Sequence, residues 1–404
     1  MKTKRYKYSK LFRDIYNFLG FVYSQIIDNG DVVHFFLRRT RKRAICPRCN
    51  RRTPLTYESY KRTIRDLNLS SKQCYVTFFE NKIRCKCGFR GYEKLAFTRP
   101  YARCTIRFEE FIASLCKKMT LSDVCELFGI NWKTAKEIDK YYIKQQMTNL
   151  NHITPRRIGI DEIAYEKGHK YLTIVRDLDL NGVIWIGIDR KEETLNRFFR
   201  ELGIFKCHQI KIAVVDMWDP YLASLNKHCP NVDIVVDKFH LIKMILNALD
   251  KVRKVEFAQA SDEERLYMKK KRFVILKRNM NLNDKQKEGL TELMDRNEIL
   301  YKAYLLKEQI SDILDEDNVT SALDRLSHWT KNVYDSGIKP LIKCIKTIRK
   351  YYYGIYNYFR YKLTNAQSEG FNNKINIVKR KAYGYWDLEY FFLKIFQACG
   401  VMRR

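Results

Sequence analysis

The sequence predicts a mixed α/β domain that carries a long helical insertion and follows two smaller modules. Three observations lead to this prediction. Five short apolar runs lie between residues 158 and 236, separated by turn and helix patterns. A helical pattern then continues from Leu241 to about Leu363, with no glycine between Ala248 and Glu288. The first 100 residues are instead basic, are strand-like in part, and contain two closely spaced cysteine pairs.

The composition points to an intracellular protein with a polyanionic partner. The chain has 404 residues, 46% of them apolar, which is enough for more than one core. No run of about 18 apolar residues is present and the start lacks a signal-peptide core, so we expect a cytoplasmic protein without membrane contact. The 77 basic and 46 acidic residues give a net charge of +31, which favours nucleic acid as the partner.

The basic charge is densest near the N-terminus. Positions 38 to 52 hold eight Lys or Arg residues and no acidic residue. A solvated face normally mixes both signs, so this run favours phosphate binding. The candidate DNA-contacting residues here are Arg41, Lys42, Arg43 and Arg48.

Two cysteine pairs predict a structural metal site. Twelve cysteines in an intracellular chain indicate metal binding or buried thiols, not disulfides. A C-x2-C pair and a C-x-C pair supply the four thiolates that tetrahedral zinc requires, and Gly88 eases the backbone at the second pair. The alternatives are four unrelated buried thiols, or His34 or Cys74 as a substitute ligand. The predicted zinc ligands are Cys46, Cys49, Cys85 and Cys87.

Residues 119–135 have the pattern of a helix-turn-helix. Thr120 or Ser122 is placed to cap the first helix, Gly129 lies at the turn, and Asn131 is placed to cap the second helix. The recognition helix is expected from Asn131 to Lys144, and the alternative is an ordinary helical hairpin. The residues expected to contact DNA are Lys133, Lys136 and Lys140.

The strand order after the linker at 151–155 identifies the mixed domain. Strands are expected at 158–164, 171–176, 183–188, 210–215 and 233–236, with helices after the third and fourth. The second and third strands form a hairpin, for which Asn181-Gly182 predicts a type I′ turn. The order β-β-β-α-β-α-β is that of a ribonuclease H-like domain with a five-stranded mixed sheet, in which the first and fourth strands are adjacent and parallel. The inserted 120 or so residues need a role such as clamping DNA or contacting a second subunit.

Three carboxylates are candidates for a metal site in this domain. Asp161 interrupts the first apolar strand, Asp216 ends the fourth, and Glu369 lies on a polar helical stripe near the C-terminus. A carboxylate that leaves water must pair, bind a metal or take up a proton, whereas an edge strand would simply expose Asp161. Together the three carboxylates suit two Mg2+ ions. Strand alternation puts Glu162 on the opposite face from Asp161.

The helical segment around Glu369 carries amides and basic residues on one face. Asn365, Glu369, Asn376 and either Asn372 or Asn373 recur at helical spacing, while Phe371 and Ile375 occupy another face. Amides beside one acid suit the orientation of a carboxylate, or contact with phosphate and base edges. The DNA-contacting candidates here are Asn372, Asn373, Lys374, Lys379 and Arg380.

The motifs, taken in order, resemble the ISL-three family of bacterial insertion-sequence transposases, in the DDE group with a ribonuclease H-like catalytic core. The matching segments are Cys46-Pro47-x-Cys49 with Cys85-x-Cys87, Gly159-Ile160-Asp161-Glu162, Asp216-Met217-Trp218-x-Pro220-Tyr221, Asp237-x-Phe239-His240, Thr364-Asn365-x3-Glu369-Gly370-x-Asn372-Asn373-Lys374, and Lys379-Arg380-x-Ala382-Tyr383-Gly384. The resemblance covers nearly the whole chain. It implies that Asp161, Asp216 and Glu369 are the catalytic triad, and that Asp237 and His240 form the D-x2-H motif of related transposases.

The resemblance also implies an activity. The N-terminal module would bind the terminal inverted repeats of the element, and two Mg2+ (or Mn2+) ions would support strand cleavage by water and then attack of the freed 3′-hydroxyl on target DNA. Joining two ends implies a homodimer or higher homo-oligomer on double-stranded DNA, in association with the bacterial nucleoid. His240 is expected to orient a carboxylate or to act as an acid or base, with a packing role as the alternative.

Two other functions fit parts of the sequence. A structure-specific nuclease of the same fold would use the same carboxylates, and a domesticated DNA-binding regulator would use only the N-terminal modules. Inverted repeats that flank the coding region would favour a transposase.

The expected domain organisation follows from these motifs. It is a zinc-binding module at 1–100, a helix-turn-helix domain at 101–150, the first part of the ribonuclease H-like core at 151–240, the helical insertion at 241–363, and the C-terminal helices of the core at 364–404.

Overall fold

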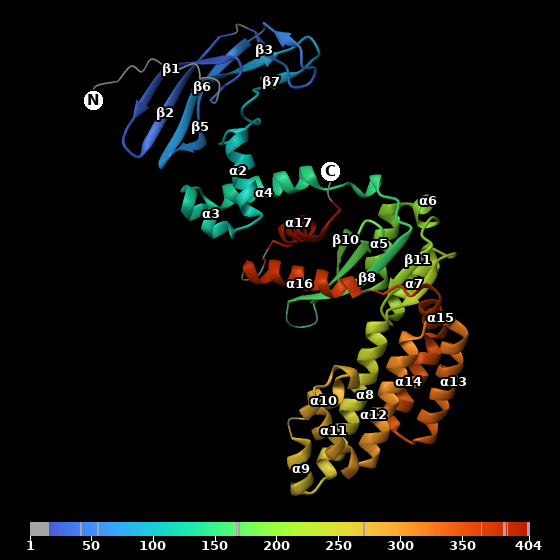
Figure 1. Cartoon of the computed structure of the whole chain (residues 1–404). Coiled ribbons are helices and arrows are strands. Elements are labelled where there is room, and N and C mark those ends of the chain that lie inside the picture. Colours follow the sequence, from blue (N-terminus) through green and yellow to red (C-terminus); the bar gives the residue numbers. More distant parts are fainter. Residues whose placement is uncertain are drawn as a thin grey trace. The chain divides into compact units, whose positions relative to one another are not determined.

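The computed structural model describes residues 16–40, 43–54, 56–166, 168, 170–269, 271–364, 366–382, 385 and 387–401, except for the side chains of 366–369. The chain divides into two compact units, Met1–Gln146 and Met147–Arg404 (Figure 1). Each unit has hydrophobic cores of its own.

The first unit begins with a five-stranded sheet. Its strands are β1 (Phe21–Asp28), β2 (Val32–Arg39), β5 (Thr56–Leu69), β6 (Lys72–Arg84) and β7 (Arg90–Tyr92). The order is β1-β2-β6-β5, with β7 also paired to β6, and only the β2–β6 pair is parallel. In β2, Val33, Phe35 and Leu37 are buried and alternate with more exposed residues, as the two-residue period of a strand requires. A small hairpin of β3 (Ala44–Ile45) and β4 (Arg52–Thr53) completes the strands.

Three helices follow the sheet in the first unit and include the predicted helix-turn-helix. They are α2 (Ile106–Cys116), α3 (Leu121–Phe128) and α4 (Trp132–Gln146). Thr120 caps α3 in a capping box with Asp123, and Gly129 ends it in the left-handed conformation (φ 59°). The side chain of Asn131 accepts a hydrogen bond of 2.8 Å from the backbone amide of Lys133, which confirms the capping role expected for Asn131.

The second unit contains the five-stranded mixed sheet that the sequence predicted. Its strands are β8 (Arg157–Glu166), β9 (Lys170–Asp177), β10 (Gly182–Ile188), β11 (Ile212–Val215) and β12 (Asp233–Val236), in the order β10-β9-β8-β11-β12. The pairs β10–β9 and β9–β8 are antiparallel, whereas β8–β11 and β11–β12 are parallel. This is the ribonuclease H-like arrangement, with the first and fourth strands adjacent and parallel.

The turn between β9 and β10 differs from the prediction. A type I′ turn centred on Asn181-Gly182 would need positive φ at both residues. Asn181 has φ 52°, but Gly182 is already the first residue of β10 and pairs with Asp177. The loop is therefore longer, and Asp177 stabilises it by accepting the amides of Asp179 and Leu180 at 2.8 and 2.9 Å.

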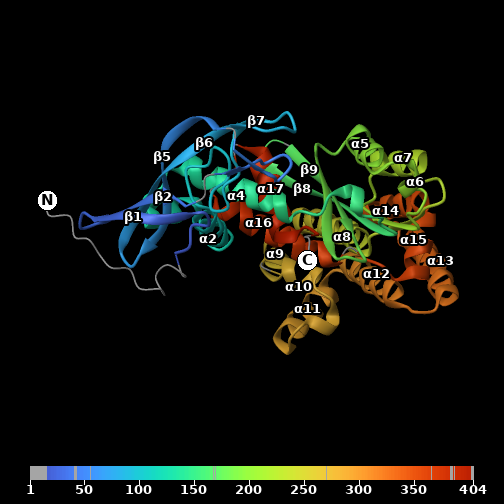
Figure 2. The same ribbon diagram turned by 90° about the horizontal axis from the view of Figure 1, so that it is seen from above.

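Helices cover both faces of this sheet (Figures 1 and 2). On one face, α5 (Glu192–Leu202) and α7 (Asp219–His228) pack over Ile158, Ile160 and Val215. On the other face, α16 (Ala366–Lys381) and α17 (Leu388–Cys399) pack over Ile163. Neighbouring residues of β8 thus serve opposite faces, so Asp161 lies on the α16 face and Glu162 on the α5 face.

The helical insertion forms a bundle that begins and ends at the sheet. Its long helices are α8 (Lys238–Gln259), α11 (Asp284–Arg296), α12 (Glu298–Asp315), α13 (Val319–Asp335), α14 (Lys339–Lys350) and α15 (Tyr352–Tyr361); the shorter ones are α9 (Asp262–Met268), α10 (Arg272–Leu276) and the 3-10 turn η2 (Asn279–Asn281). The remaining short helices of the second unit are η1 (Leu150–His152) and α6 (Ile204–Cys207). The bundle core includes Val235 and Val236 of β12, so the insertion and the sheet share one hydrophobic core.

None of the helices that the structure describes combines the length and the apolar character needed to cross a lipid bilayer.

A glycine sets the distance between α15 and the edge strand β12. A Cβ on Gly354 would lie 2.6 Å from Val236 Cγ2 and 3.3 Å from the Val236 backbone nitrogen. Asn357 of α15 also donates from Nδ2 to the Ile234 carbonyl of β12 at 2.9 Å. The close approach of α15 to β12 therefore depends on the missing side chain.

We expect Gly354→Ala to lower the free energy of unfolding of the second unit by about 1–2 kcal/mol, because overpacking outweighs the better helix propensity of alanine. Gly370→Ala is the matched control, since a Cβ at Gly370 of α16 meets nothing within 4 Å. Thermal unfolding of the full chain measures both variants. Equal midpoints for the two variants would show that the contact of α15 with β12 tolerates a methyl group.

Candidate active site and cysteine cluster

Three buried aspartates lie side by side on neighbouring strands. Val214 pairs with Gly159, so the parallel register of β11 and β8 continues to Asp216 beside Asp161. Val215 pairs with Val236, and the amide of Asp237 donates to the Val215 carbonyl at 3.0 Å, which places Asp237 on the other side of Asp216. Asp161 and Asp216 are each 7% exposed and Asp237 is 2% exposed. The structure therefore brings together two of the three carboxylates that the sequence singled out.

His240 joins this row from the first turn of α8. Asp237 caps that helix, and its side chain accepts the Phe239 amide at 3.2 Å. The cap places His240 Nδ1 at 2.8 Å from Asp216 Oδ1 and 3.7 Å from Asp237 Oδ2. Neither Nδ1 of His240 nor Oδ1 of Asp216 has a hydrogen bond of good geometry within the described residues, so the contact is an ion pair.

Burial and the neighbouring charges shift the pKa values of Asp216 and His240. Burial raises the pKa of Asp216 to about 6, with Asp161 and Asp237 adding to the rise and His240 opposing it. Burial lowers the pKa of His240, but Asp216 and Asp237 together raise it more, to about 10. Without a cation, the imidazolium of His240 therefore offsets part of the buried negative charge.

Part of this cluster could hold a divalent cation. One ligand atom from each of Asp216, Asp237 and His240 lies within 4.8 Å of the others, and Asp161 lies next to this group in the row. Carboxylate oxygens are the ligands that Mg2+ and Mn2+ prefer, and two buried polar atoms here lack hydrogen bonds.

Asn372 of α16 holds Asp161. Its Nδ2 donates to Asp161 Oδ2 at 3.0 Å, and the backbone amide of Glu162 donates to Oδ1 at 2.8 Å. Both oxygens of the carboxylate are thus oriented. Glu162 itself forms an ion pair with Arg190 at 3.1 Å on the other face of the sheet, where the guanidinium lies over the Trp218 ring.

Glu369 lies in the first turn of α16, three residues before Asn372. Residues three apart on a helix share a face. The side chain of Glu369 lies outside the described residues, so its place as the third carboxylate stays a prediction.

Arg176 of β9 is a site residue that we did not predict from the sequence. Its side chain is buried, 2% exposed, and its guanidinium lies 4.8 Å from the centre of the Phe371 ring on α16. It interacts electrostatically with Asp161 and Asp237, while burial lowers its pKa. An arginine at the end of an apolar strand is the signal that identifies it, the same kind of signal that singled out Asp161.

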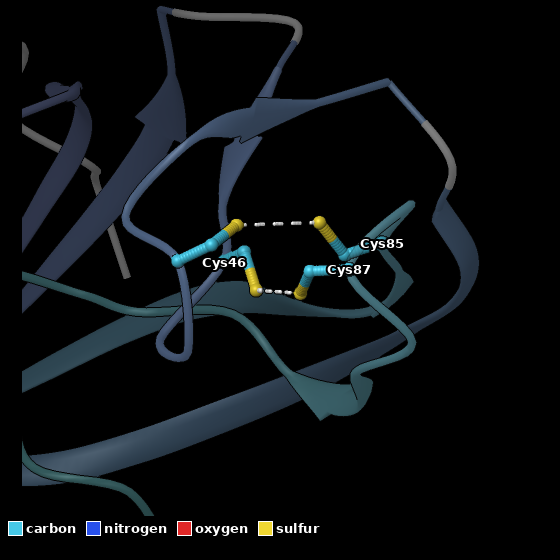
Figure 3. Close-up of side chains that lie close together, drawn as sticks. Cys46, Cys85 and Cys87 are labelled. Atoms are coloured by element: carbon cyan, nitrogen blue, oxygen red, sulfur yellow. Dashed lines mark hydrogen bonds between the residues drawn. The ribbon is translucent and has the colours of Figure 1, made fainter.

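The four predicted cysteines come together in the first unit. Figure 3 shows Cys46 of the knuckle after β3 facing Cys85 and Cys87 after β6. The Sγ atoms of Cys46 and Cys87 are 3.6 Å apart, as are those of Cys49 and Cys85, and all four lie within 4.8 Å of one another. Four thiols this close together are a ligand set of the kind that suits tetrahedral zinc.

Local structure explains the cysteine cluster. Gly88, with φ 87°, turns the chain after the second pair. Burial raises the pKa of Cys46, but the backbone amides of Cys49 and Arg48 and the neighbouring thiols lower it by more, to about 7. The backbone amide of Cys87 lowers the pKa of Cys85, but burial and the neighbouring thiols raise it by more, to about 11. The two alternative ligands lie elsewhere, since Cys74 is in the core of the sheet and His34 stacks on Tyr75.

The predicted DNA-contacting residues fall into three groups. Arg41 and Lys42 lie outside the described residues, while Arg43 and Arg48 are exposed beside the cysteine cluster. On α4, Lys133 is exposed and Lys136 lies over the Trp132 ring, with Lys140 half-buried one turn further on. On α16, the exposed candidates are Asn373, Lys374 and Arg380, while Lys379 reaches the Ala164 carbonyl at 3.5 Å.

Comparison with known proteins agrees with this arrangement. A family model described as "Transposase" matches residues 158–395, and a model described as "Helix-turn-helix domain of transposase family ISL3" matches residues 93–143. The transposase for insertion sequence element IS1001 of Bordetella parapertussis is 30% identical over 372 residues, which cover 91% of this chain and 92% of that protein. The transposase for insertion sequence element IS1557 of Mycobacterium tuberculosis is 25% identical over 388 residues, which cover 89% and 87%.

The first match spans the mixed sheet, the insertion and α16, and the second spans the helices α2 to α4. The aspartate row and the helix-turn-helix thus lie within the matched segments, and the similarity to whole transposases extends over nine-tenths of the chain. The chain belongs to the ISL3 family of transposases.

Proposed function

We propose that this transposase binds the terminal inverted repeats of an insertion sequence, cleaves DNA at the ends of the element and joins the freed ends to target DNA in a divalent-metal-dependent reaction. The observation that carries the proposal is the buried row of Asp161, Asp216 and Asp237, with His240 against Asp216. Clustered carboxylates cost free energy in a protein interior unless a cation binds them. A sheet with only a structural role would not need three carboxylates buried side by side.

We assign Asp161, Asp216 and Glu369 as the ligands of two Mg2+ or Mn2+ ions. When bound, two such metal ions lower the pKa of the attacking water or hydroxyl and stabilise the leaving oxygen in an in-line displacement at phosphorus. The same ligands serve hydrolysis by water and the later attack of a 3′-hydroxyl. The protein then needs no covalent nucleophile.

The neighbouring residues have positioning roles in this proposal. Asn372 fixes the rotamer of Asp161 through its 3.0 Å hydrogen bond. Asp237 caps α8 and so places His240 against Asp216. The positive charges of His240 and Arg176 limit the repulsion among the carboxylates before metal binds.

The first unit supplies recognition of the element ends in this proposal. A zinc ion held by Cys46, Cys49, Cys85 and Cys87 would fix the loops that carry Arg41, Lys42, Arg43 and Arg48. Lys133, Lys136 and Lys140 of α4 would contact DNA from the second helix of the helix-turn-helix. Asn373, Lys374, Lys379 and Arg380 of α16 would contact DNA close to the carboxylates.

Joining two ends requires two active sites, so we propose a homodimer or higher homo-oligomer on double-stranded DNA. Its place of action would be the bacterial nucleoid, where both element and target lie.

We expect Asp161→Asn, Asp216→Asn and Glu369→Gln each to reduce strand cleavage by at least about 1000-fold, because each removes a ligand charge while preserving shape. Labelled duplexes of the element end, incubated with Mg2+, measure cleavage, and gel shifts measure binding. Binding of end DNA should stay within about twofold of the wild type. A variant that still cleaves would remove that residue from the site, and a wild-type chain that binds but never cuts would favour a regulator.

We expect Cys46→Ser to lose the bound zinc and to weaken binding of end DNA at least about tenfold, because three ligands hold a structural zinc poorly. Elemental analysis of the purified chain should give one zinc in the wild type. Cys125→Ser, at a half-buried cysteine of α3 outside the cluster, is the control for zinc content. Less than one zinc per wild-type chain, with Cys46→Ser harmless, would refute the zinc site.

We expect the affinity for Mn2+ to fall about tenfold between pH 7 and pH 5. The pKa of Asp216 is raised to about 6, so protons compete with the cation increasingly as pH falls through that value. Calorimetric titration at several pH values measures this, with Asp216→Asn as the control that should lose the dependence. An affinity that is constant from pH 5 to pH 7 would exclude Asp216 as a ligand.

A further inference from the structure

A cavity opens beside the aspartate row, between two helices of the insertion. Its volume is about 550 Å³, and its lining includes Asp216, Trp218 and His240. From His240 the lining follows α8 through Lys243 to Lys251, a length of about 16 Å at 1.5 Å per residue. Across the cavity, the lining follows α14 from Lys339 to Thr347. We name this cavity the α8–α14 groove.

Lysines line both walls of the groove. Lys243 and Lys251 of α8 and Lys339 and Lys343 of α14 recur at helical spacing, so each pair stands on one face of its helix. All four are exposed, and within the described part of the chain none lies within 4.0 Å of a carboxylate. By contrast, Lys254 at the far end of α8 is paired with Asp250 at 3.1 Å. The groove thus gathers four lysines that have no carboxylate partner among the described residues, against two lining carboxylates, Glu162 and Asp216.

The floor of the groove is apolar. Met244 and Ala248 of α8 and Cys344 of α14 line it, and Cys344 Sγ contacts the Met244 carbonyl at 4.0 Å where the helices meet. Pro340 also lines the groove, so the N-terminal end of α14, with its positive dipole, opens there. Cationic walls over an apolar floor suit a strand whose phosphates meet lysines while its sugars and bases lie on apolar atoms.

We propose that the α8–α14 groove binds the phosphodiester backbone of a single DNA strand and leads that strand to Asp216. The inference rests on the proposed function, because it takes the aspartate row as the place of reaction. Cavities of about 300–1,000 Å³ take ligands of drug size, so a cavity of about 550 Å³ takes part of a single strand and not a double helix. The insertion would then guide a DNA strand to the aspartate row. This role would explain why the insertion begins directly after β12, beside Asp237.

Residue-resolved footprinting tests the groove in the full chain without relying on activity. The probe is a single-stranded oligothymidylate of roughly 12 nucleotides, with a duplex of the same length for comparison. Lysines are acetylated in the presence of EDTA and the modified peptides are quantified by mass spectrometry. We expect the single strand to slow acetylation of Lys243, Lys251, Lys339 and Lys343 at least about fivefold. Lys346, which is exposed on α14 but does not line the groove, should react at an unchanged rate.

Charge reversal provides the functional arm. We expect Lys243→Glu with Lys343→Glu to reduce strand cleavage at least about tenfold, and Lys346→Glu to stay within about twofold of the wild type. If the double variant Lys243→Glu with Lys343→Glu is unfolded, as judged by circular dichroism, the double variant Lys243→Gln with Lys343→Gln replaces it in the cleavage assay. Unprotected groove lysines, or a charge-reversed variant that cleaves like the wild type, would overturn the proposal. If the wild type cleaves no DNA, the proposed function fails, while the footprint still decides whether the groove binds a strand.

Discussion

The parallel pairing of β8, β11 and β12 forces three buried carboxylates into one row, and the rest of the second unit compensates for this. Burial raises the pKa of Asp216, and the charges of Asp161 and Asp237 add to the rise. The compensating groups come from three different elements, since His240 belongs to α8, Arg176 to β9 and Asn372 to α16. The site is therefore assembled only when the sheet, the first helix of the insertion and the C-terminal helix have all folded together.

This constraint explains why the insertion is joined so closely to the sheet. Asp237 ends β12 as a member of the row and at the same time caps α8, so the first helix of the insertion begins within the site. The bundle returns through α15, which packs on β12 at Gly354 and hydrogen-bonds to it through Asn357. Between these two attachments, α8 and α14 form the lysine-lined groove. The insertion is therefore attached to the strand that carries Asp237 at both of its ends, and it shares a hydrophobic core with that strand.

The first unit solves a different physical problem. Its long strands β5 and β6 carry the cysteine cluster at one end, where only a small satellite core of Ala44, Cys46, Ile83 and Cys85 surrounds the thiols. So small a core buries little apolar surface, and a metal bound by the four thiolates would add to the stability of the two cysteine loops. The helix-turn-helix in the same unit instead has conventional caps and its own apolar core.

The sequence by itself determined the elements and their order. The strands of the mixed sheet, the caps at Thr120 and Asn131, and the pairing of Cys46 and Cys49 with Cys85 and Cys87 were predictable, because apolar period, cap chemistry and ligand spacing are local properties. The turn at Asn181-Gly182 was predicted wrongly, because strand register and the side chain of Asp177 overrode a dipeptide preference. The role of Glu369 stays a prediction from its place on α16.

Only the tertiary structure decided which groups meet. No local stretch specifies the residue register that sets Asp216 beside Asp161, the choice of Asp161 as the partner of Asn372 across 211 residues, or the approach of the lysines of α8 to those of α14. Each depends on packing between segments that are far apart in the chain, and the free energy of that packing comes from the shared hydrophobic cores rather than from the polar residues themselves. Local chemistry identified the carboxylates as candidates, and the folding of the whole unit placed Asp161 and Asp216 side by side.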